Sequence, residues 1–296
     1  MNLFNLNKKR AQKYHQEAQH LSDAGKDSEA IELYLKAIEL DPEKSESFYN
    51  LGLIYKYRNE WLLSFDYNKR ANELAPEDEA ARWNLAIAAT ALRQWDIARL
   101  AWKQNGIEIE GDDGPINMNF GITPVRLNPD GDGEVVWGTR IDPARVRIDS
   151  IPYADSGFKY GDVVLNDGAP VGYRKIGERE YSVFNVLEVF ESSEYETSIA
   201  SVEILQEEDL QELEKIFSAT PHNFEDWTTN IRNICRQCSE GRPHDHHDAE
   251  LKNEWSAQRT LGVAIYKNQH VYQLFEDWQK RTGAKLLSLK SSDVRC

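Results

Sequence analysis

The first hundred residues repeat with a period of 34, and this recurrence restricts the fold of the chain more than any other feature. The recurring residues are mainly apolar or small, with one asparagine among them. The pairs that lie 34 positions apart are Pro42 and Pro76, Ala37 and Ala71, Asn50 and Asn84, Leu51 and Leu85, Gly52 and Ala86, and Trp61 and Trp95. Agreement of many positions on one period predicts stacked units near residues 11–44, 45–78 and 79–107.

Each unit has the pattern of a helix pair. The recurring prolines end helices, because proline cannot continue a helix. Small residues such as Gly52 and Ala86 let two helices approach closely. In period and in these positions the segment resembles the tetratricopeptide-repeat family. The resemblance implies an all-α array over residues 1–107 with a concave groove that holds polypeptides, and we expect the chain after residue 106 to cover the open end of the stack.

The resemblance also implies which residues line the groove: Tyr14, Asn50, Tyr57, Asn84 and Arg93. One chemistry of this family is a clamp for a C-terminal carboxylate, which uses an asparagine at the position of Asn50 and basic residues on the first helices of repeats one and three. The clamp positions for basic residues here hold His15, Gln19, Ala80 and Asn84. These side chains offer a carboxylate little attraction. We therefore interpret Asn50 as a structural member of its repeat and discount a chaperone tail as the ligand.

The formal net charge of −15 is concentrated in the middle of the chain. Residues 107–220 carry 9 Lys and Arg against 24 Asp and Glu, a net charge of −15, whereas the segments on either side are close to neutral. The chain has no basic block for phosphates, so we expect neither a nucleic-acid nor a membrane partner. The acidic segment is suited to a basic protein, for example a basic toxin domain. The alternative is that it only keeps a β-rich domain soluble.

The location of the protein is predicted from what the sequence lacks. No secretory signal is recognisable at the start, and no apolar run reaches the roughly 18 residues that a membrane span needs. The cysteines number three, an odd count that is typical of a reducing compartment rather than of a disulfide framework. We expect a cytoplasmic protein.

Residues 108–200 are predicted to form an acidic, β-rich domain, either a small barrel or a curled sheet. Short runs of β-branched and aromatic residues alternate there with turn signals. The predicted strands are Glu134–Ile141, Arg145–Ile151, Gly161–Leu165, Val171–Ile176 and Tyr181–Phe184. The stretch Asn166–Pro170 predicts a turn between two of them.

Residues 201–296 are predicted to form a small α+β domain, so the whole chain is multidomain. Strands and helices alternate in the pattern of a ferredoxin-like layer. The predicted elements are a strand at Val202–Leu205, a helix at Glu207–Phe217, a strand at Leu261–Tyr266, a helix at Val271–Arg281 closed by Gly283, and a strand at Lys285–Leu289.

A Cys/His-rich insertion in this last region is the only stretch whose residue types suggest metal binding. Its candidate ligands are Cys235, Cys238, His244, His246 and His247. Zinc favours four nitrogen or sulfur ligands in a tetrahedron, which makes a closed, structural zinc site the hypothesis. The alternative is that Cys235 ends a packed helix and the histidines lie in solvent. No other cofactor is indicated.

Three functions follow from these observations. The first is a non-catalytic protein-binding protein, most concretely an immunity protein or antitoxin that blocks a partner toxin. The layout of few repeats joined to an acidic β-rich domain resembles bacterial tetratricopeptide proteins found beside polymorphic toxins. The second is a scaffold or co-chaperone adaptor. The third is a metal-dependent enzyme centred on residues Cys235–Asp248, although no catalytic set is recognisable.

Overall fold

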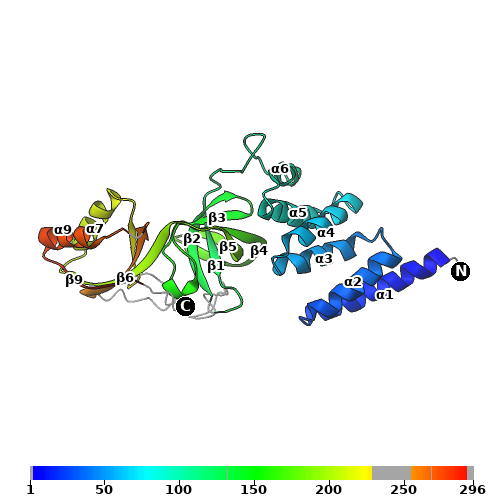
Figure 1. The fold of residues 1–296 in the computed structure, drawn as a ribbon, viewed down its shortest axis with the longest axis horizontal. Coiled ribbons are helices and arrows are strands. Elements are labelled where there is room, and N and C mark those ends of the chain that lie inside the picture. Colours follow the sequence, from blue (N-terminus) through cyan, green and yellow to red (C-terminus); the bar gives the residue numbers. More distant parts are fainter. Residues whose placement is uncertain (1–2, 132, 229–254, 268, 292–296) are drawn as a thin grey trace. The chain divides into compact units, whose positions relative to one another are not determined.

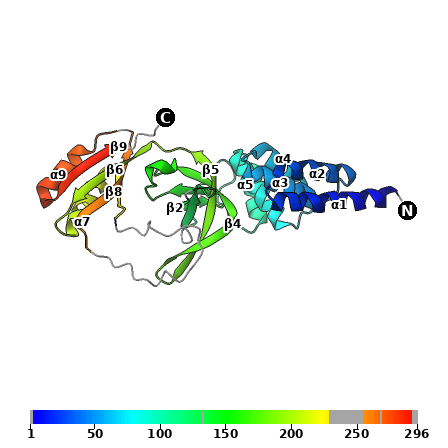
Figure 2. The same cartoon turned by 90° about the horizontal axis from the view of Figure 1, so that it is seen from below.

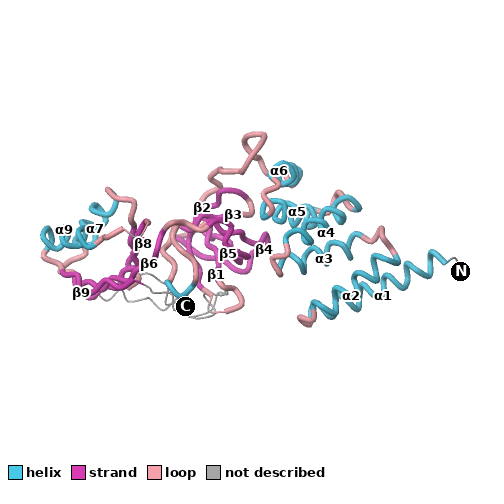
Figure 3. Tube along the Cα trace, viewed as in Figure 1, coloured by secondary structure: helices cyan, strands magenta, loops and turns pink. Residues whose placement is uncertain are grey.

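The computed structural model describes residues 3–131, 133–228, 255–267 and 269–291, in two compact units, Met1–Met118 and Asn119–Cys296. The first unit is helical and the second carries the strands, as Figure 3 shows. This confirms the predicted multidomain class, with an all-α array before β-rich and α+β regions. None of the described helices combines the length and apolar character that crossing a bilayer requires.

The described helices of the first unit form three antiparallel pairs (Figure 1). They are α1 (Leu3–Asp23) with α2 (Asp27–Leu40), α3 (Ser45–Tyr57) with α4 (Trp61–Leu74), and α5 (Glu79–Ala91) with α6 (Trp95–Gln104). Helix α1 begins before the first predicted repeat. The turn inside each pair repeats as well, because Gly25, Asn59 and Arg93 lie 34 apart and have φ of 72°, 57° and 58°. Each left-handed residue ends the first helix of its pair.

Small residues let the two helices of a pair touch. A Cβ added to Gly52 on α3 would lie 2.4 Å from the amide nitrogen of Asn68 on α4, so this position requires glycine or a shift of the facing side chain. Ala30, Ala37 and Ala98 are fully buried at the corresponding contacts of the other helices. The expected close packing of helices at small residues is therefore present.

The segment after α6 folds back onto that helix. The guanidinium of Arg99, which is 6% exposed, donates hydrogen bonds to the backbone carbonyls of Glu110, Gly111 and Gly114 at 2.7–3.0 Å. With a longer bond to the carbonyl of Pro115 at 3.4 Å, one cation binds four carbonyls that an irregular segment would otherwise leave without partners. The first unit consequently continues past its last helix to residue 118.

The second unit begins with a closed five-stranded barrel in the order β1-β2-β3-β4-β5. The strands are β1 (Ile122–Leu127), β2 (Glu134–Asp142), β3 (Arg145–Ile148), β4 (Val163–Ile176) and β5 (Arg179–Glu191), with a short 3₁₀ helix at Ala154–Ser156. Neighbours are antiparallel except β1 and β5, whose parallel pairing closes the barrel. An apolar core that includes Val125, Val146 and Val164 fills it.

The predicted turn at Asn166–Pro170 is wrong. Strand β4 runs through it, and β4 and β5 form one long hairpin, visible in Figure 2. The ladder register shifts between Asn166 and Pro170, so the residues that favour a turn are accommodated as a β-bulge. Pairing with β5 along the full length of β4 outweighs the local turn preference.

The chain then forms a four-stranded antiparallel sheet in the order β7-β8-β6-β9. Its elements are β6 (Tyr195–Glu203), α7 (Glu208–Ser218), β7 (Asn223–Asp226), β8 (Gln258–Tyr266), α9 (Tyr272–Thr282) and β9 (Lys285–Ser291). This β-α-β-β-α-β order with β6 and β8 at the centre is a ferredoxin-like topology, as predicted, although β7 was not among the predicted strands. Gly283 closes α9 in the left-handed conformation, as predicted.

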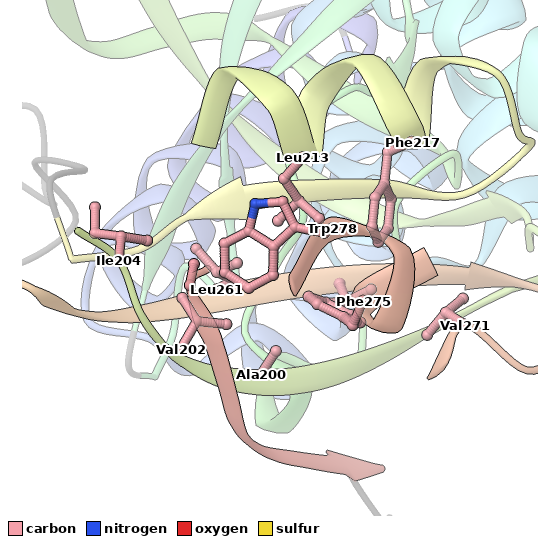
Figure 4. Packing of buried hydrophobic residues seen from close by; sticks show 11 residues of the cluster. Ala200, Val202, Ile204, Leu213, Phe217, Leu261, Val271, Phe275 and Trp278 are labelled. Carbon is pink, nitrogen blue, oxygen red and sulfur yellow. The ribbon is translucent and has the colours of Figure 1, made fainter. Parts of the chain in front are cut away.

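The helices α7 and α9 both cover one face of this sheet, and Figure 4 shows the apolar layer between the helices and the sheet. Leu213 and Phe217 of α7 and Phe275 and Trp278 of α9 are at most 2% exposed. The indole nitrogen of Trp278 donates to the backbone carbonyl of Asp209 at 2.6 Å, so the buried ring leaves no polar atom without a partner and ties α9 to α7.

The opposite face of the sheet packs against a loop of the barrel through Trp227. A Cβ at Gly262 on β8 would lie 2.2 Å from the Trp227 ring, so the indole lies directly on the backbone of the sheet. Tyr153 from the barrel packs edge-on at 4.9 Å, and the backbone N–H of Ile151 donates to the carboxylate of Glu225 at 2.8 Å. Apolar and polar contacts thus join the barrel to the sheet.

The left-handed turn of the first repeat predicts the effect of Gly25→Ala. No atom lies within 4 Å of the added Cβ, so the only cost is the left-handed backbone of an L-residue. We expect the free energy of unfolding to fall by about 1 kcal/mol, measured by urea unfolding of the full chain followed by circular dichroism. Gly25→Asn is the matched control and should cost less, because asparagine occupies the equivalent position 59. Equal costs for the two variants would contradict this explanation.

The contact between Trp227 and Gly262 predicts that Gly262→Ala destabilises the second unit. The added methyl group would overlap the indole, and overpacking of this kind typically costs about 1–3 kcal/mol. Trp227→Leu in the same chain should recover part of that loss, because the smaller side chain leaves room. Thermal unfolding of the two single variants and the double variant measures this coupling, and strictly additive losses would argue against the steric cause.

Candidate functional site

The first helix of each pair is linked to the first helix of the next pair, and we call the side of the array that α1, α3 and α5 form the first-helix face. Two buried hydrogen bonds connect them. The imidazole Nδ1 of His15 on α1 lies 2.9 Å from the hydroxyl of Ser47 on α3. The ammonium of Lys56 on α3 donates to the side-chain carbonyl of Asn84 on α5 at 3.1 Å. These polar bonds, in addition to the apolar core, therefore hold successive first helices at a fixed spacing.

Asn50 makes a structural bond to the preceding repeat, whereas the sequence interpretation placed it within its own repeat. Its amide nitrogen donates to the hydroxyl of Tyr34 on α2 at 3.0 Å. Burial raises the pKa of Tyr34 to about 12, so the phenol stays protonated and accepts this bond at neutral pH. The amide joins the first repeat to the second, and its hydrogen-bonding partner is a neutral group.

Lys56 and Asn84 form a deeply buried polar pair on the first-helix face. They are 2% and 6% exposed. The ammonium also lies 4.5 Å from the centroid of the Tyr57 ring, a cation–π contact. A buried lysine needs such partners, because an unpaired charge away from water is costly. Asn84 thus has a structural role in addition to any contact with a partner.

His15 does not supply the positive charge that a carboxylate clamp requires. Its ring is 8% exposed and packs edge-on against Tyr34 at 5.5 Å. Burial lowers its pKa, and the charge of Lys44 lowers it further, whereas Glu46 opposes the shift. The imidazole is therefore neutral at physiological pH. This agrees with the expectation that a bare carboxylate gains little at the clamp positions.

The other predicted groove residues occupy three different environments. Tyr57, at the end of α3, is 55% exposed, and Arg93 lies in the exposed left-handed turn before α6. Tyr14 is half-buried on α1. The residue at the equivalent position of the second repeat is Phe48 on α3, and its ring packs against Tyr67 of α4. This position therefore faces the second helix of its own pair. Contact of these residues with a partner stays a prediction.

Sequence reasoning missed the pairings that hold the face together. His15 and Ser47 are 32 positions apart, and Lys56 and Asn84 are 28 apart, so neither follows the 34-residue period. Lys56 carried no signal of its own in the sequence. The burial of Lys56 depends on which faces of α3 and α5 pack against each other, and the 34-residue period does not specify this.

The predicted metal ligands Cys235, Cys238, His244, His246 and His247 lie outside the described residues. Within the ranges that the structure describes, no three His, Cys, Asp or Glu side chains gather into a group that would hold a metal ion. Zinc at the Cys/His cluster stays a prediction.

Comparison with known proteins gives one family match and several weak structural likenesses. The family model "TPR repeat" matches residues 21–56, which span α2 and most of α3. Two solved structures, the first and second TPR domains of Spaghetti (RPAP3), each bound to the HSP90 peptide SRMEEVD, are 20% identical with TM-scores of 0.31 and 0.33. They cover 33% and 34% of this chain and 77% and 88% of their own.

A third solved structure, a hypothetical protein from Neisseria gonorrhoeae, is 10% identical with a TM-score of 0.25 and covers 58% of this chain and 93% of its own. No curated protein matches the chain. The matched residues 21–56 include the left-handed turn at Gly25 and the first members of five of the six pairs that recur after 34 residues. The N-terminal helical array of this chain is therefore a tetratricopeptide-repeat segment.

Proposed function

We propose that the chain is a non-catalytic protein-binding protein whose first-helix face holds a partner polypeptide. The observation that carries the proposal is that buried hydrogen bonds link α1 to α3, from His15 to Ser47, and α3 to α5, from Lys56 to Asn84. Three helices held at a fixed spacing form one continuous, pre-organised surface, which reduces the entropic cost of binding. Tetratricopeptide repeats commonly serve protein–protein interaction, which supports this assignment.

In its most specific form, the proposal is a cytoplasmic immunity protein or antitoxin that binds and blocks a partner toxin. The charge distribution supports this form, because residues 107–220 carry the whole net charge of −15. A partner with a basic surface, such as a nucleic-acid-cleaving toxin domain, would be attracted and steered to this segment. The genes beside this one test it directly, because an immunity gene is expected next to a toxin gene.

A scaffold or co-chaperone adaptor is the second candidate. The second unit supports it, because the sheet has an apolar core of its own and offers an independent surface for another protein. Recognition of a chaperone's C-terminal carboxylate is disfavoured, since His15 is neutral and Gln19, Ala80 and Asn84 carry no charge.

Site-specific photo-crosslinking tests the first-helix face. A benzophenone amino acid replaces Tyr57, at the end of α3, and in a matched control it replaces Leu62 on α4. The two positions are 55% and 61% exposed, so both probes are equally accessible, but only the first lies on a first helix. We expect a crosslinked partner from the Tyr57 position in cells of the native host and little or none from Leu62. Capture at Leu62 alone, or equal capture at both, would contradict the proposal.

Metal analysis of the purified full chain tests the zinc prediction and the enzyme alternative together. We expect one zinc ion per chain and its loss in Cys235→Ser with Cys238→Ser, because both thiolates would be ligands. A structural site predicts lower thermal stability of the double variant without loss of partner binding at the array. A metal-free wild-type chain would refute the zinc site, and loss of a measurable catalytic activity with an intact fold would favour the enzyme.

A further inference from the structure

A second surface in the Asn119–Cys296 unit has the properties of a binding site. An open groove of about 780 Å³ lies between α7 and β7, with Tyr160 from the barrel and Tyr195 among its lining residues. Its volume is in the range of sites that hold ligand groups. We call it the α7–β7 groove. It lies in a different unit from the first-helix face, so it does not depend on the function proposed for the array.

The walls of this groove are held in place from behind. Leu213 and Phe217 anchor α7 in the apolar core, as Figure 4 shows, and the ring of Phe217 packs against Phe224 of β7 at 5.2 Å. On the barrel side, the carboxylate of Glu225 accepts the backbone N–H of Ile151. Helix, strand and barrel therefore present their groove-lining atoms from rigid supports, which limits the ordering cost of binding.

The groove is strongly acidic. Four carboxylates line it: Glu207 at the N-cap of α7, Glu214 within α7, and Glu225 and Asp226 from β7. The described lining residues include neither lysine nor arginine. The guanidinium of Arg259, which is 3% exposed, binds Glu207 and Asp226 from behind and offsets one of these charges. A net negative potential remains, so the groove is complementary to a cationic ligand.

The aromatic side chains indicate which cation fits. Tyr160 and Tyr195 pack edge to face at 4.9 Å and an interplanar angle of 85°, and both line the groove. Tyrosine faces beside carboxylates suit guanidinium and ammonium groups, which combine cation–π and ionic contacts. Glu207 and Glu214 are seven residues apart in the helical segment, about 10 Å along its axis, too far for one compact cation to contact both.

We propose that the α7–β7 groove binds an arginine- or lysine-rich, extended polypeptide segment of a partner. Successive basic side chains reach the spaced carboxylates of Glu207 and Glu214, and one cationic head lies against the Tyr160 and Tyr195 rings. The basic groups of a polypeptide are spaced along an extended backbone, so one segment can contact both carboxylates. A single compact cation cannot. The acidity of residues 107–220 extends the attraction beyond the groove itself and steers such a segment toward it.

The test uses the full chain and a fluorescent nonapeptide of alternating arginine and valine, followed by anisotropy. Glu214→Lys reverses the charge of a groove carboxylate and should weaken binding by about tenfold or more, a loss of roughly 1.4 kcal/mol. Glu208→Lys is the matched control, because Glu208 is an exposed residue of the same helix that does not line the groove. We expect the affinity of the Glu208→Lys variant for the peptide to stay within about twofold of the wild type, because an exposed charge outside the groove contributes little. A peptide with glutamine in place of arginine should not bind.

Several results would overturn this proposal. They are no binding of the basic peptide by the wild-type chain, equal losses in Glu214→Lys and Glu208→Lys, and equal affinity for free spermine. If Glu214→Lys fails to fold, amide chemical-shift changes in the wild-type chain decide the question. Shifts at Glu214, Phe224 and Tyr160 on adding the peptide support the groove, and shifts confined to other regions refute it. Crosslinking at Tyr57 tests binding at the first-helix face separately. A negative result at the α7–β7 groove can therefore be told apart from a negative result at the first-helix face.

Discussion

The close approach of paired helices, repeated every 34 residues, is the constraint on which the N-terminal unit depends. It has two physical components. Small residues such as Gly52 and Ala86 allow backbones to touch, and a left-handed residue at Gly25, Asn59 and Arg93 turns the chain between the helices of each pair. Because every pair turns in the same way, the first helices come to lie next to one another. The first-helix face is a consequence of that regularity.

The contacts between the repeats add specificity that the regular packing alone lacks. A buried hydrogen bond must be satisfied by a particular partner, whereas an apolar contact tolerates sliding. The bond of Lys56 to Asn84 and that of His15 to Ser47 therefore fix the register between successive pairs. Burial also keeps His15 neutral, and Gln19, Ala80 and Asn84 carry no charge, so this face lacks the charge pattern of a carboxylate clamp.

The parts of the fold that repeat or that have strong periodicity were predictable, and the rest depended on long-range pairing. The helix pairs, α7 and α9 follow from patterns that local residues carry, and so do the strands β6, β8 and β9. The continuous strand β4 does not, because Asn166–Pro170 has turn residues and only pairing with β5 makes it a bulge. Strand β7 is four residues, Asn-Phe-Glu-Asp, without a β signal, and only its pairing with β8 identifies it. The acidic groove was missed for the same reason, since its carboxylates come from two elements that sequence does not bring together.

Hydrogen–deuterium exchange of the full chain, with and without a partner purified from the native host, tests the central claim most directly. The account predicts that the partner slows exchange in peptides from α1, α3 and α5, the helices that form the first-helix face, while those from α2, α4 and α6 change little. Protection confined to the second helices, or to the Asn119–Cys296 unit alone, would contradict the claim that the repeat array binds a polypeptide.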